Sequence, residues 1–422
     1  MENMQKNSVA RARLQAFFDQ ATFVELGAYV RRPTAPDEAE GVVTGYGAVQ
    51  GRLVFAFAQD ISAMKGAVDG RHAEKIAALY AKALSVGAPV VAMLDSTGVL
   101  VFEGAAALGG YGLLLRTVAE AAGVVPQIAL ISGTCKGTLA TLAALFDFVV
   151  LDKQAPAPAG VQAALIADGE AEGFDGIRAL LRYLPDDSIS PALPASPYDD
   201  PNRALSLQDR TTAAEALAAL VDGGTYLSLF GGAAPTVQVG LAMLGEISCV
   251  VIAADGMLDG CGAAKMTKML SFADDFGLPV VTLLNCEGVA EGEAAVLAAL
   301  ARTQSASTTA RVTVIVGSAV GAGFILGGTR GLGADMVLAL PDAEIAALSA
   351  RTAVAFFYHE KITADVSREA LEAKWKSEQA TALAAAAQGE VDDIVAPCEL
   401  RARVIAALYM LHGKDGRAPR FL

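Results

Sequence analysis

The sequence is poor in the side chains that many enzymes use for metal binding and nucleophilic attack. Three of its 422 residues are histidines, His72, His359 and His412, and none has a serine elbow or a second histidine at ligand spacing nearby. The five cysteines are odd in number and widely spaced, with no C-x-x-C pair and no Cys/His cluster. We therefore expect no metal site, no disulfide framework and none of the usual hydrolase arrangements.

Basic charge and uninterrupted apolar runs are also scarce. Charged residues make up 18% of the chain, 46 acidic against 32 basic, which gives a formal net charge of -14. This excess of negative charge argues against nucleic acid as a partner. The longest apolar stretches, 223–245 and 312–329, are interrupted by glycines, so we expect no membrane insertion. The polar residues 1–6 lack the apolar core of a secretory signal, which favours a cytoplasmic location.

Apolar residues are abundant, at 54% of the chain, and they fall in a pattern that occurs twice. Residues 75–99 have a counterpart at 265–289, at a constant offset of 190 (75 to 265, 95 to 285). A second block, 128–140, recurs at 312–324, where the offset is 184 (133 to 317). Such self-similarity predicts a duplicated fold.

Each copy of the repeat predicts the same order of elements. An amphipathic helix, a G-x-P turn and a wholly apolar strand are followed by a glycine-bearing loop, and then by a second strand, a G-x-x-x-G turn and a helix start. Strands that are apolar on both faces are typical of α/β folds. We therefore predict two α/β domains, residues 1–205 and 206–422, joined within the proline-rich stretch 185–210.

The glycine-rich turns indicate a chemistry that needs no catalytic side chain. At a strand-to-helix turn the first backbone N–H groups of the helix lack partners and, with the helix dipole, favour a negatively charged oxygen. Neither turn continues as the G-K-[ST] of a phosphate loop. The oxyanion of an enolate is therefore favoured over a nucleotide phosphate. From the residues alone, simple packing geometry is the alternative for both turns.

A set of motifs in a specific order extends over nearly the whole chain. The motifs are F-V-E-L at 23–26, G-V-V-T-G-x-G at 41–47, Q-D at 59–60, G-R-H-A-E-K-I at 70–76, G-A-P-V at 87–90, D-S-x-G at 95–98, E-G at 103–104, V-P-Q-I at 125–128, P-x-A-E-I-A at 341–346 and G-x-V-D-x-I at 389–394. In this order they resemble the biotin-dependent carboxyltransferases, which are subunits of acetyl- and propionyl-CoA carboxylases and of sodium-pumping acyl-CoA decarboxylases. The resemblance implies two tandem crotonase-like domains of the ββα-superhelix type, which agrees with the repeat.

The resemblance also implies where the reacting groups bind. The acyl-CoA thioester would lie on the N-terminal domain and carboxybiotin on the C-terminal domain of a facing protomer, each carbonyl oxygen held by a pair of backbone N–H groups. Carried onto this sequence, the thioester pair is Gly137 and Thr138, and the biotin pair is Ala322 and Gly323. We take these four residues as the catalytic candidates.

Residues around these turns complete the implied site. The loops Thr97–Gly98 and Glu287–Gly288 would face the two pairs, and Lys136 is a candidate to add positive charge beside a thioester enolate. The sequence departs from the family pattern here. It has Gly137–Thr138 where the family has paired glycines, no arginine after Gly98, and acidic residues in the loop 286–292. A threonine can donate its N–H from a helix start but not from a left-handed turn.

The function that the resemblance implies is transfer of a carboxyl group between carboxybiotin and an acyl-CoA, in the carboxylase or the decarboxylase direction. No A-M-K-M biotin-acceptor motif occurs, so the biotin would be attached to a separate biotin carboxyl carrier protein. Biotin carboxylase or membrane decarboxylase subunits are the further partners implied. Since sites of this family are built across two protomers, a homodimer or a trimer of dimers is expected.

Two other functions fit parts of the sequence. A non-catalytic crotonase-fold paralogue that assembles or regulates a carboxylase or decarboxylase complex would explain the altered turn motifs. A biotin-independent CoA isomerase or hydratase would need paired acids near the first turn, for which Asp95 and Glu103 are the candidates.

Overall fold

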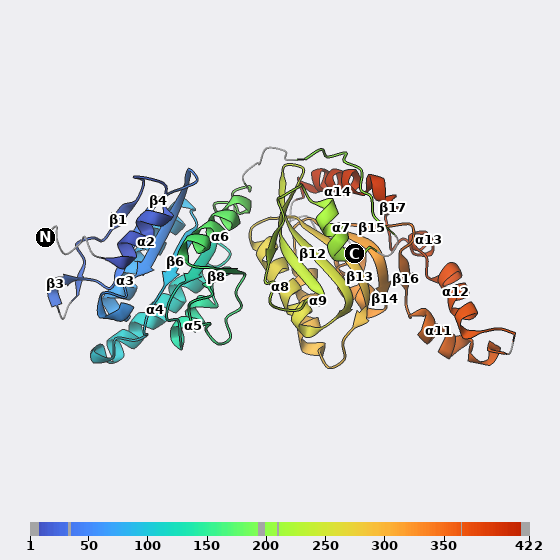
Figure 1. Cartoon of the computed structure of the whole chain (residues 1–422), viewed down its shortest axis with the longest axis horizontal. Coiled ribbons are helices and arrows are strands. Elements are labelled where there is room, and N and C mark those ends of the chain that lie inside the picture. The colour runs from blue at the N-terminus through green and yellow to red at the C-terminus, as the bar shows by residue number, and fades with distance from the viewer. Residues whose placement is uncertain (1–7, 33–34, 193–198, 209–210, 364, 415–422) are drawn as a thin grey trace. The chain divides into compact units, whose positions relative to one another are not determined.

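The computed structural model shows two compact units, residues 1–191 and 192–422 (Figure 1). It describes residues 8–32, 35–192, 199–208, 211–363 and 365–414. Part of the predicted junction, residues 193–198 and 209–210, lies outside these ranges, and the boundary placed between residues 205 and 206 stays a prediction. Both units combine helices with a mixed sheet, which confirms the predicted α/β class and its occurrence in two halves.

Unit 1 is built on a seven-stranded sheet of order β1-β4-β5-β6-β7-β8-β9. The first two pairings are antiparallel and the remaining four are parallel. The strands of unit 1 are β1 (Val24–Leu26), β2 (Arg31–Arg32), β3 (Ala35–Ala39), β4 (Val42–Val49), β5 (Arg52–Gln59), β6 (Val90–Leu94), β7 (Gln127–Ile131), β8 (Phe148–Asp152) and β9 (Leu165–Ala167). Its helices are α2 (Val9–Phe17), α3 (Gly70–Val86), α4 (Ala105–Ala121), α5 (Thr138–Ala143) and α6 (Glu170–Tyr183).

Unit 2 repeats this plan with an eight-stranded sheet, in which β10-β11-β12 pair antiparallel and β12-β13-β14-β15-β17 pair parallel, while β16 pairs with β14. Its strands are β10 (Leu227–Leu229), β11 (Val237–Leu244), β12 (Ile247–Leu258), β13 (Val280–Val289), β14 (Arg311–Val320), β15 (Met336–Ala339), β16 (Glu344–Ala346) and β17 (Asp393–Ile394). Its helices are α7 (Ala213–Leu220), α8 (Gly260–Asp275), α9 (Ala294–Ala306), α10 (Ala322–Leu326), α11 (Ala350–Phe357), α12 (Arg368–Gln379), α13 (Ala382–Ala387) and α14 (Pro397–Leu411).

The helix, turn and strand of the sequence repeat form as predicted. In unit 1 the Asp69 side chain accepts a hydrogen bond from the His72 amide at the start of α3, and Gly87 ends the helix with φ +64° before the buried strand β6. In unit 2 Asp259 caps α8 in the same way, and Gly277 also has φ +64°. The positive φ suits glycine because it has no Cβ to collide with the backbone.

The duplication extends beyond the sequence blocks. Phe55 lies opposite Val90 in unit 1, and Val250 lies opposite Val280 in unit 2. Because Val90 and Val280 are counterparts in the repeat, Asp60 and Asp255, each five residues further along the chain, occupy equivalent positions. Each lies just beyond the apolar part of its strand. Asp60 accepts a hydrogen bond from Ser8, the N-cap of α2. Asp255 accepts from the first two backbone amides of α7. The first helix of each unit is therefore held at its positive end by an equivalent carboxylate.

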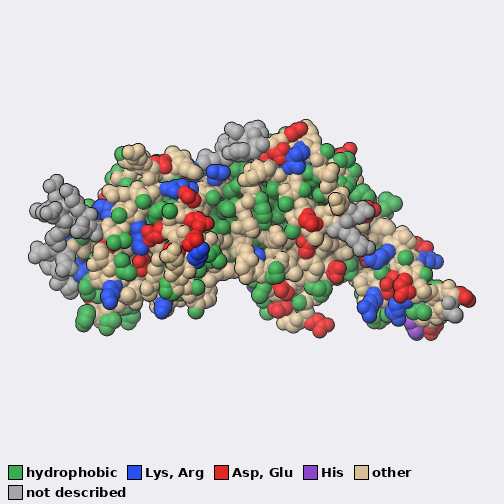
Figure 2. All heavy atoms as spheres, in the orientation of Figure 1, with side chains coloured by type: hydrophobic (Ala, Val, Ile, Leu, Met, Phe, Trp, Pro, Cys, Tyr) green, Lys and Arg blue, Asp and Glu red, His purple; other side chains and the backbone are tan. Residues whose placement is uncertain are grey.

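The surface of unit 2 includes a pair of helices, α11 and α12, that pack mainly on each other. The rings of Phe357 and Trp375 stack with centroids 6.1 Å apart, whereas Phe356 is 74% exposed. Charged side chains of both signs gather over this pair in Figure 2.

Within the described ranges, no helix is both long and apolar enough to cross a bilayer.

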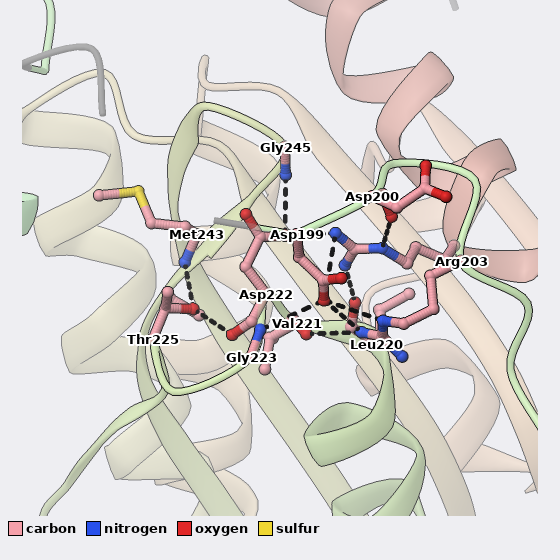
Figure 3. A network of polar contacts seen from close by, with 12 residues as sticks. Asp199, Asp200, Arg203, Leu220, Val221, Asp222, Gly223, Thr225, Met243 and Gly245 are labelled. Carbon is pink, nitrogen blue, oxygen red and sulfur yellow. Dashed lines mark hydrogen bonds and ion pairs between the residues drawn. The ribbon is translucent and has the colours of Figure 1, made fainter. Parts of the chain in front are cut away.

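A buried ion pair joins distant segments of unit 2 (Figure 3). The Arg401 guanidinium on α14 is 0% exposed and lies 2.5 Å from the Asp222 carboxylate, which is also fully buried. Arg401 donates two further hydrogen bonds, to the carbonyl oxygens of Leu220 at the end of α7 and of Asp200. Asp222 also accepts from the Gly245 amide in the β11–β12 turn. This network fixes α14, α7 and the hairpin to one another.

We predict that Arg401→Met lowers the free energy of unfolding of unit 2 by about 3–5 kcal/mol, because it leaves the buried Asp222 carboxylate without its cation. Urea unfolding followed by circular dichroism measures the shift. Arg403→Met is the matched control on the same helix. The Arg403 side chain is 56% exposed, and we expect a change within about 0.5 kcal/mol. Equal effects of the two substitutions would show that the network is not a structural element.

Candidate functional site

The first predicted pair of amides, those of Gly137 and Thr138, lies at the start of α5, after the segment that follows β7. Gly137 is the N-cap of α5, with φ +57° and ψ -129°, a conformation that glycine adopts without strain, and Thr138 is the first helical residue. Lys136, Gly137 and Thr138 are all exposed. In the part of the chain that the structure describes, the amides of Gly137 and Thr138 have no hydrogen-bond acceptor. The turn therefore presents two backbone donors, and the threonine occupies the position that tolerates it.

The loop predicted to face this turn is held by its own hydrogen bonds. The backbone amide and the hydroxyl of Thr97 both point to the Lys65 carbonyl oxygen, at 3.2 and 3.4 Å, and the Gly98 amide donates to the Ser96 hydroxyl. Gly98 has φ +112°, and a Cβ placed on it would contact nothing within 4 Å. The amides of this loop are thus already paired, while its outer side is open.

Asp95 joins the loop to the turn. Its carboxylate accepts a hydrogen bond of 3.0 Å from the Thr134 amide, and the next residue, Ser96, donates to the Thr134 carbonyl oxygen. The other carboxylate oxygen lies 3.3 Å from the guanidinium of Arg13 on α2. A Cβ on Gly133 would lie 2.0 Å from the Asp95 carboxylate, so glycine is needed there. Asp95 is 3% exposed and is engaged as an acceptor, which leaves little of it free to act as an acid.

Tyr111 is a polar residue at this site that sequence reasoning missed. Its hydroxyl is buried close to Ser96 and Cys135. Burial raises the pKa of Tyr111 to about 12, and burial raises the pKa of the Cys135 thiol to about 12 as well. The thiol is therefore neutral and unreactive at physiological pH. The G-Y-G triplet at 110–112, inside α4, carries no sequence signal that would single out Tyr111.

The second predicted pair lies at the start of α10. Gly321 has φ +55° and ψ -126°, almost the conformation of Gly137, and Ala322 begins the helix. No acceptor for the amides of Ala322 and Gly323 occurs among the residues whose placement is described. A Cβ on Gly323 would lie 2.8 Å from the Cys286 sulfur and 3.0 Å from the Gly288 amide nitrogen. The structure thus brings the predicted turn into contact with residues 286–288, and Glu287 is exposed beside them. The loop predicted at Glu287–Gly288 is instead the last part of β13, because Gly288 still pairs with β12.

Asn285 holds the second turn as Asp95 holds the first. Its side-chain oxygen accepts a hydrogen bond of 2.8 Å from the Ser318 amide, and its NH₂ group donates to Asp255 at 2.9 Å. A Cβ on Gly317 would lie 2.3 Å from this side chain. In both units a side-chain oxygen just after the apolar part of one strand accepts from a backbone amide of the neighbouring segment, which follows β7 in unit 1 and is still part of β14 in unit 2. The charge of the supporting partner is positive in unit 1 and negative in unit 2.

Comparison with known proteins gives full-length matches. The carboxyl transferase domain family matches residues 2–159 and 156–420. The carboxyltransferase subunit of propionyl-CoA carboxylase from Haloferax mediterranei is 30% identical over 473 residues, covering 97% of this chain and 91% of the relative. The methylmalonyl-CoA decarboxylase subunit alpha from Veillonella parvula is 31% identical over 477 residues, covering 99% and 93%.

A solved structure of similar fold is that of the transcarboxylase 12S subunit, described as a hexamer with methylmalonyl-coenzyme A bound. It superposes with a TM-score of 0.89 at 26% identity, over 100% of this chain and 92% of that one. This likeness confirms the predicted fold of two tandem crotonase-like domains.

We predict that Gly133→Ala destabilises unit 1 by about 1–3 kcal/mol, because the added methyl group must displace the Asp95 carboxylate from Thr134. Gly109→Ala in α4 is the control: a Cβ there contacts nothing within 4 Å, and alanine favours a helix by roughly 0.5–1 kcal/mol. Thermal unfolding of both variants checks the prediction. A Gly133→Ala protein as stable as the wild type would mean that Asp95 does not hold the turn.

Proposed function

This chain belongs to the carboxyl transferase domain family, as a subunit of the acyl-CoA carboxylase and decarboxylase type, and on that premise we propose that it moves a carboxyl group between carboxybiotin and an acyl-CoA thioester. The biotin is attached to a separate carrier protein. Similar identities to a carboxylase subunit and to a decarboxylase subunit are compatible with either direction of transfer. The observation that carries the proposal is the occurrence, in both units, of a helix start where two amides have no acceptor among the described residues.

In unit 1 the amides of Gly137 and Thr138 would hold the thioester oxygen as the enolate forms. Two fixed donors stabilise a developing negative charge without reorganising, and loss of one such donor typically costs about 10²–10³ in rate. The exposed Lys136 ammonium adds a positive charge beside the same oxygen. Thr97 and Gly98 would line the acyl group on the side opposite the Gly137 turn. These roles need no nucleophile or histidine from the chain.

In unit 2 the amides of Ala322 and Gly323 would hold the ureido carbonyl oxygen of biotin. When bound, carboxybiotin supplies the carboxyl group and, after losing it, a nitrogen that accepts the α-proton of the substrate. The contact between Gly323 and residues 286–288 of β13 supports a role for Glu287 and Gly288 in orienting the ring. The backbone of Gly323 can approach the strand this closely because it carries no side chain.

The partners proposed are a biotin carboxyl carrier protein and either biotin carboxylase or membrane decarboxylase subunits, in the cytoplasm. We further propose that the chain assembles as a homodimer or a trimer of dimers. The hexamer described for transcarboxylase 12S is compatible with this assembly.

We predict that Thr138→Pro and Ala322→Pro each lower the rate of carboxyl transfer by about 10²-fold or more, because proline removes one donor. Proline is well tolerated at the first position of a helix, and the preceding glycines have ψ values outside the helical region. Proline at residue 137 would be a poorer test, since its φ near -65° conflicts with the +57° of Gly137. Purified protein is assayed for transfer from carboxybiotin to a panel of acyl-CoAs.

Ala105→Pro is the matched control, because Ala105 follows Gly104, which has φ +56° and ψ -127° at the start of α4. It should transfer carboxyl groups at the wild-type rate. Full activity in both Thr138→Pro and Ala322→Pro would show that the donors are misplaced. Thioester binding without biotin-dependent exchange in the wild type would favour the non-catalytic paralogue, and activity on an enoyl-CoA without biotin would favour the isomerase or hydratase.

A further inference from the structure

A cavity of about 290 Å³ lies in unit 1 between the outer face of α3 and the segment that leaves β1. None of the residues that line it belongs to the candidate site. Its apolar wall includes Leu26, Val30 and Leu79, and Lys75 lies in the wall contributed by α3. Ligand sites usually have volumes of about 300–1,000 Å³, so a small molecule is the occupant that fits.

The Lys75 ammonium has hydrogen-bonding capacity that the protein does not use. The residue is 8% exposed, and its Nζ donates to the Val42 carbonyl oxygen at 2.7 Å. An ammonium group has three donors, and over the described ranges of the chain Val42 supplies the one acceptor. Buried charges are normally satisfied by partners, and Lys75 lines a cavity in which a partner could bind.

The second copy of the repeat shows what a purely structural lysine looks like at this position. Lys265 is the counterpart of Lys75, and it donates to the Val237 carbonyl oxygen, the equivalent of Val42, at 2.6 Å. It also donates to the Ala233 carbonyl oxygen at 2.8 Å. The lysine of unit 2 is thus held by two carbonyl groups, whereas that of unit 1 has one and faces the cavity. Lys75 therefore has one more ammonium N–H than Lys265 that a ligand in the cavity could accept from.

Gly27 keeps the stem of Lys75 accessible. It has φ +64°, and a Cβ at this position would lie 3.1 Å from Cε of Lys75. Two further cations, Arg71 and Lys82, also line the cavity, where the acid Glu74 is paired with Arg71 at 2.9 Å. Among the residues that line the cavity, cations thus outnumber acids, while the carboxylates of Glu25 and Glu40 also act on Lys75 through their charges.

We propose that this cavity binds a small aliphatic carboxylate, with its carboxylate on the Lys75 ammonium and its hydrocarbon body against Leu26, Val30 and Leu79. One buried cation matches one negative charge, and the apolar wall matches a short hydrocarbon chain better than a phosphate. Burial lowers the pKa of Lys75 to about 8, so the ammonium is still the main form at neutral pH. The charges of Glu25 and Glu40 partly oppose this lowering of the pKa, and an anion bound in the cavity would oppose it further. The proposal is independent of the carboxyl-transfer function.

The test uses the full chain with butyrate, its uncharged isostere butyramide, and inorganic phosphate, in ligand-observed NMR titrations. We expect butyrate to bind at least fivefold more tightly than butyramide or phosphate. Lys75→Met, which keeps the length of the stem, should weaken butyrate binding at least fivefold. Lys82→Met, at the exposed end of the lining, should change it less than twofold. Butyrate binding unchanged in Lys75→Met, or equal binding of butyramide, would overturn the proposal.

Protection from chemical modification keeps the test decisive if Lys75→Met does not fold. Reductive methylation of the wild-type lysines, read at Lys75 by mass spectrometry, should be slowed at least threefold by butyrate and not by butyramide. Equal rates with and without butyrate would exclude the site, and stronger protection by phosphate would show that the ligand class is an inorganic anion instead.

Discussion

A single hydrogen bond, from a backbone amide at or beyond the end of the apolar part of one central strand to a side-chain oxygen that follows the apolar part of the neighbouring strand, organises both candidate sites. It runs from Thr134 to Asp95 in unit 1 and from Ser318 to Asn285 in unit 2. Because the acceptor lies against the backbone of Gly133 or Gly317, no side chain fits there. The backbone that follows these glycines leads to the glycine N-cap of a short helix, where the candidate amides are exposed. Loss of this acceptor would free the turn from which the amides project.

The chemistry of the proposed function follows from that backbone geometry. Gly137 and Gly321 adopt nearly the same φ and ψ. Among the described residues, no acceptor lies within hydrogen-bond distance of the amides of Gly137 and Thr138 in unit 1, or of Ala322 and Gly323 in unit 2. A main-chain donor is kept with every residue except proline, so Thr138 can supply one from its position as the first residue of α5. Reliance on main-chain donors explains why the neighbouring cysteines can be buried and unreactive without loss of the proposed activity.

The two copies share their hydrogen-bonding framework and differ in the charges that support it. Asp95 is paired with Arg13, whereas Asn285 donates to Asp255. Lys265 is satisfied by two carbonyl groups, whereas Lys75 has one and lines a cavity. This difference between duplicated lysines is the basis on which we propose a binding role for Lys75. Comparing the two units of one chain thus distinguishes residues that both units need for the fold from residues whose surroundings differ between them.

The sequence by itself determined what depends on neighbours along the chain: the helix, G-x-P turn and buried strand of each repeat, the glycine N-caps, the α/β class and the resemblance that named the four amides. Local propensity and hydrophobic period fix these features within a few residues. The tertiary structure alone decided the role of Asp95, the position of Tyr111, the cavity beside Lys75 and the burial of Arg401 against Leu220, 181 residues away. Such contacts depend on which segments the folded sheet brings together, and no spacing in the sequence encodes that.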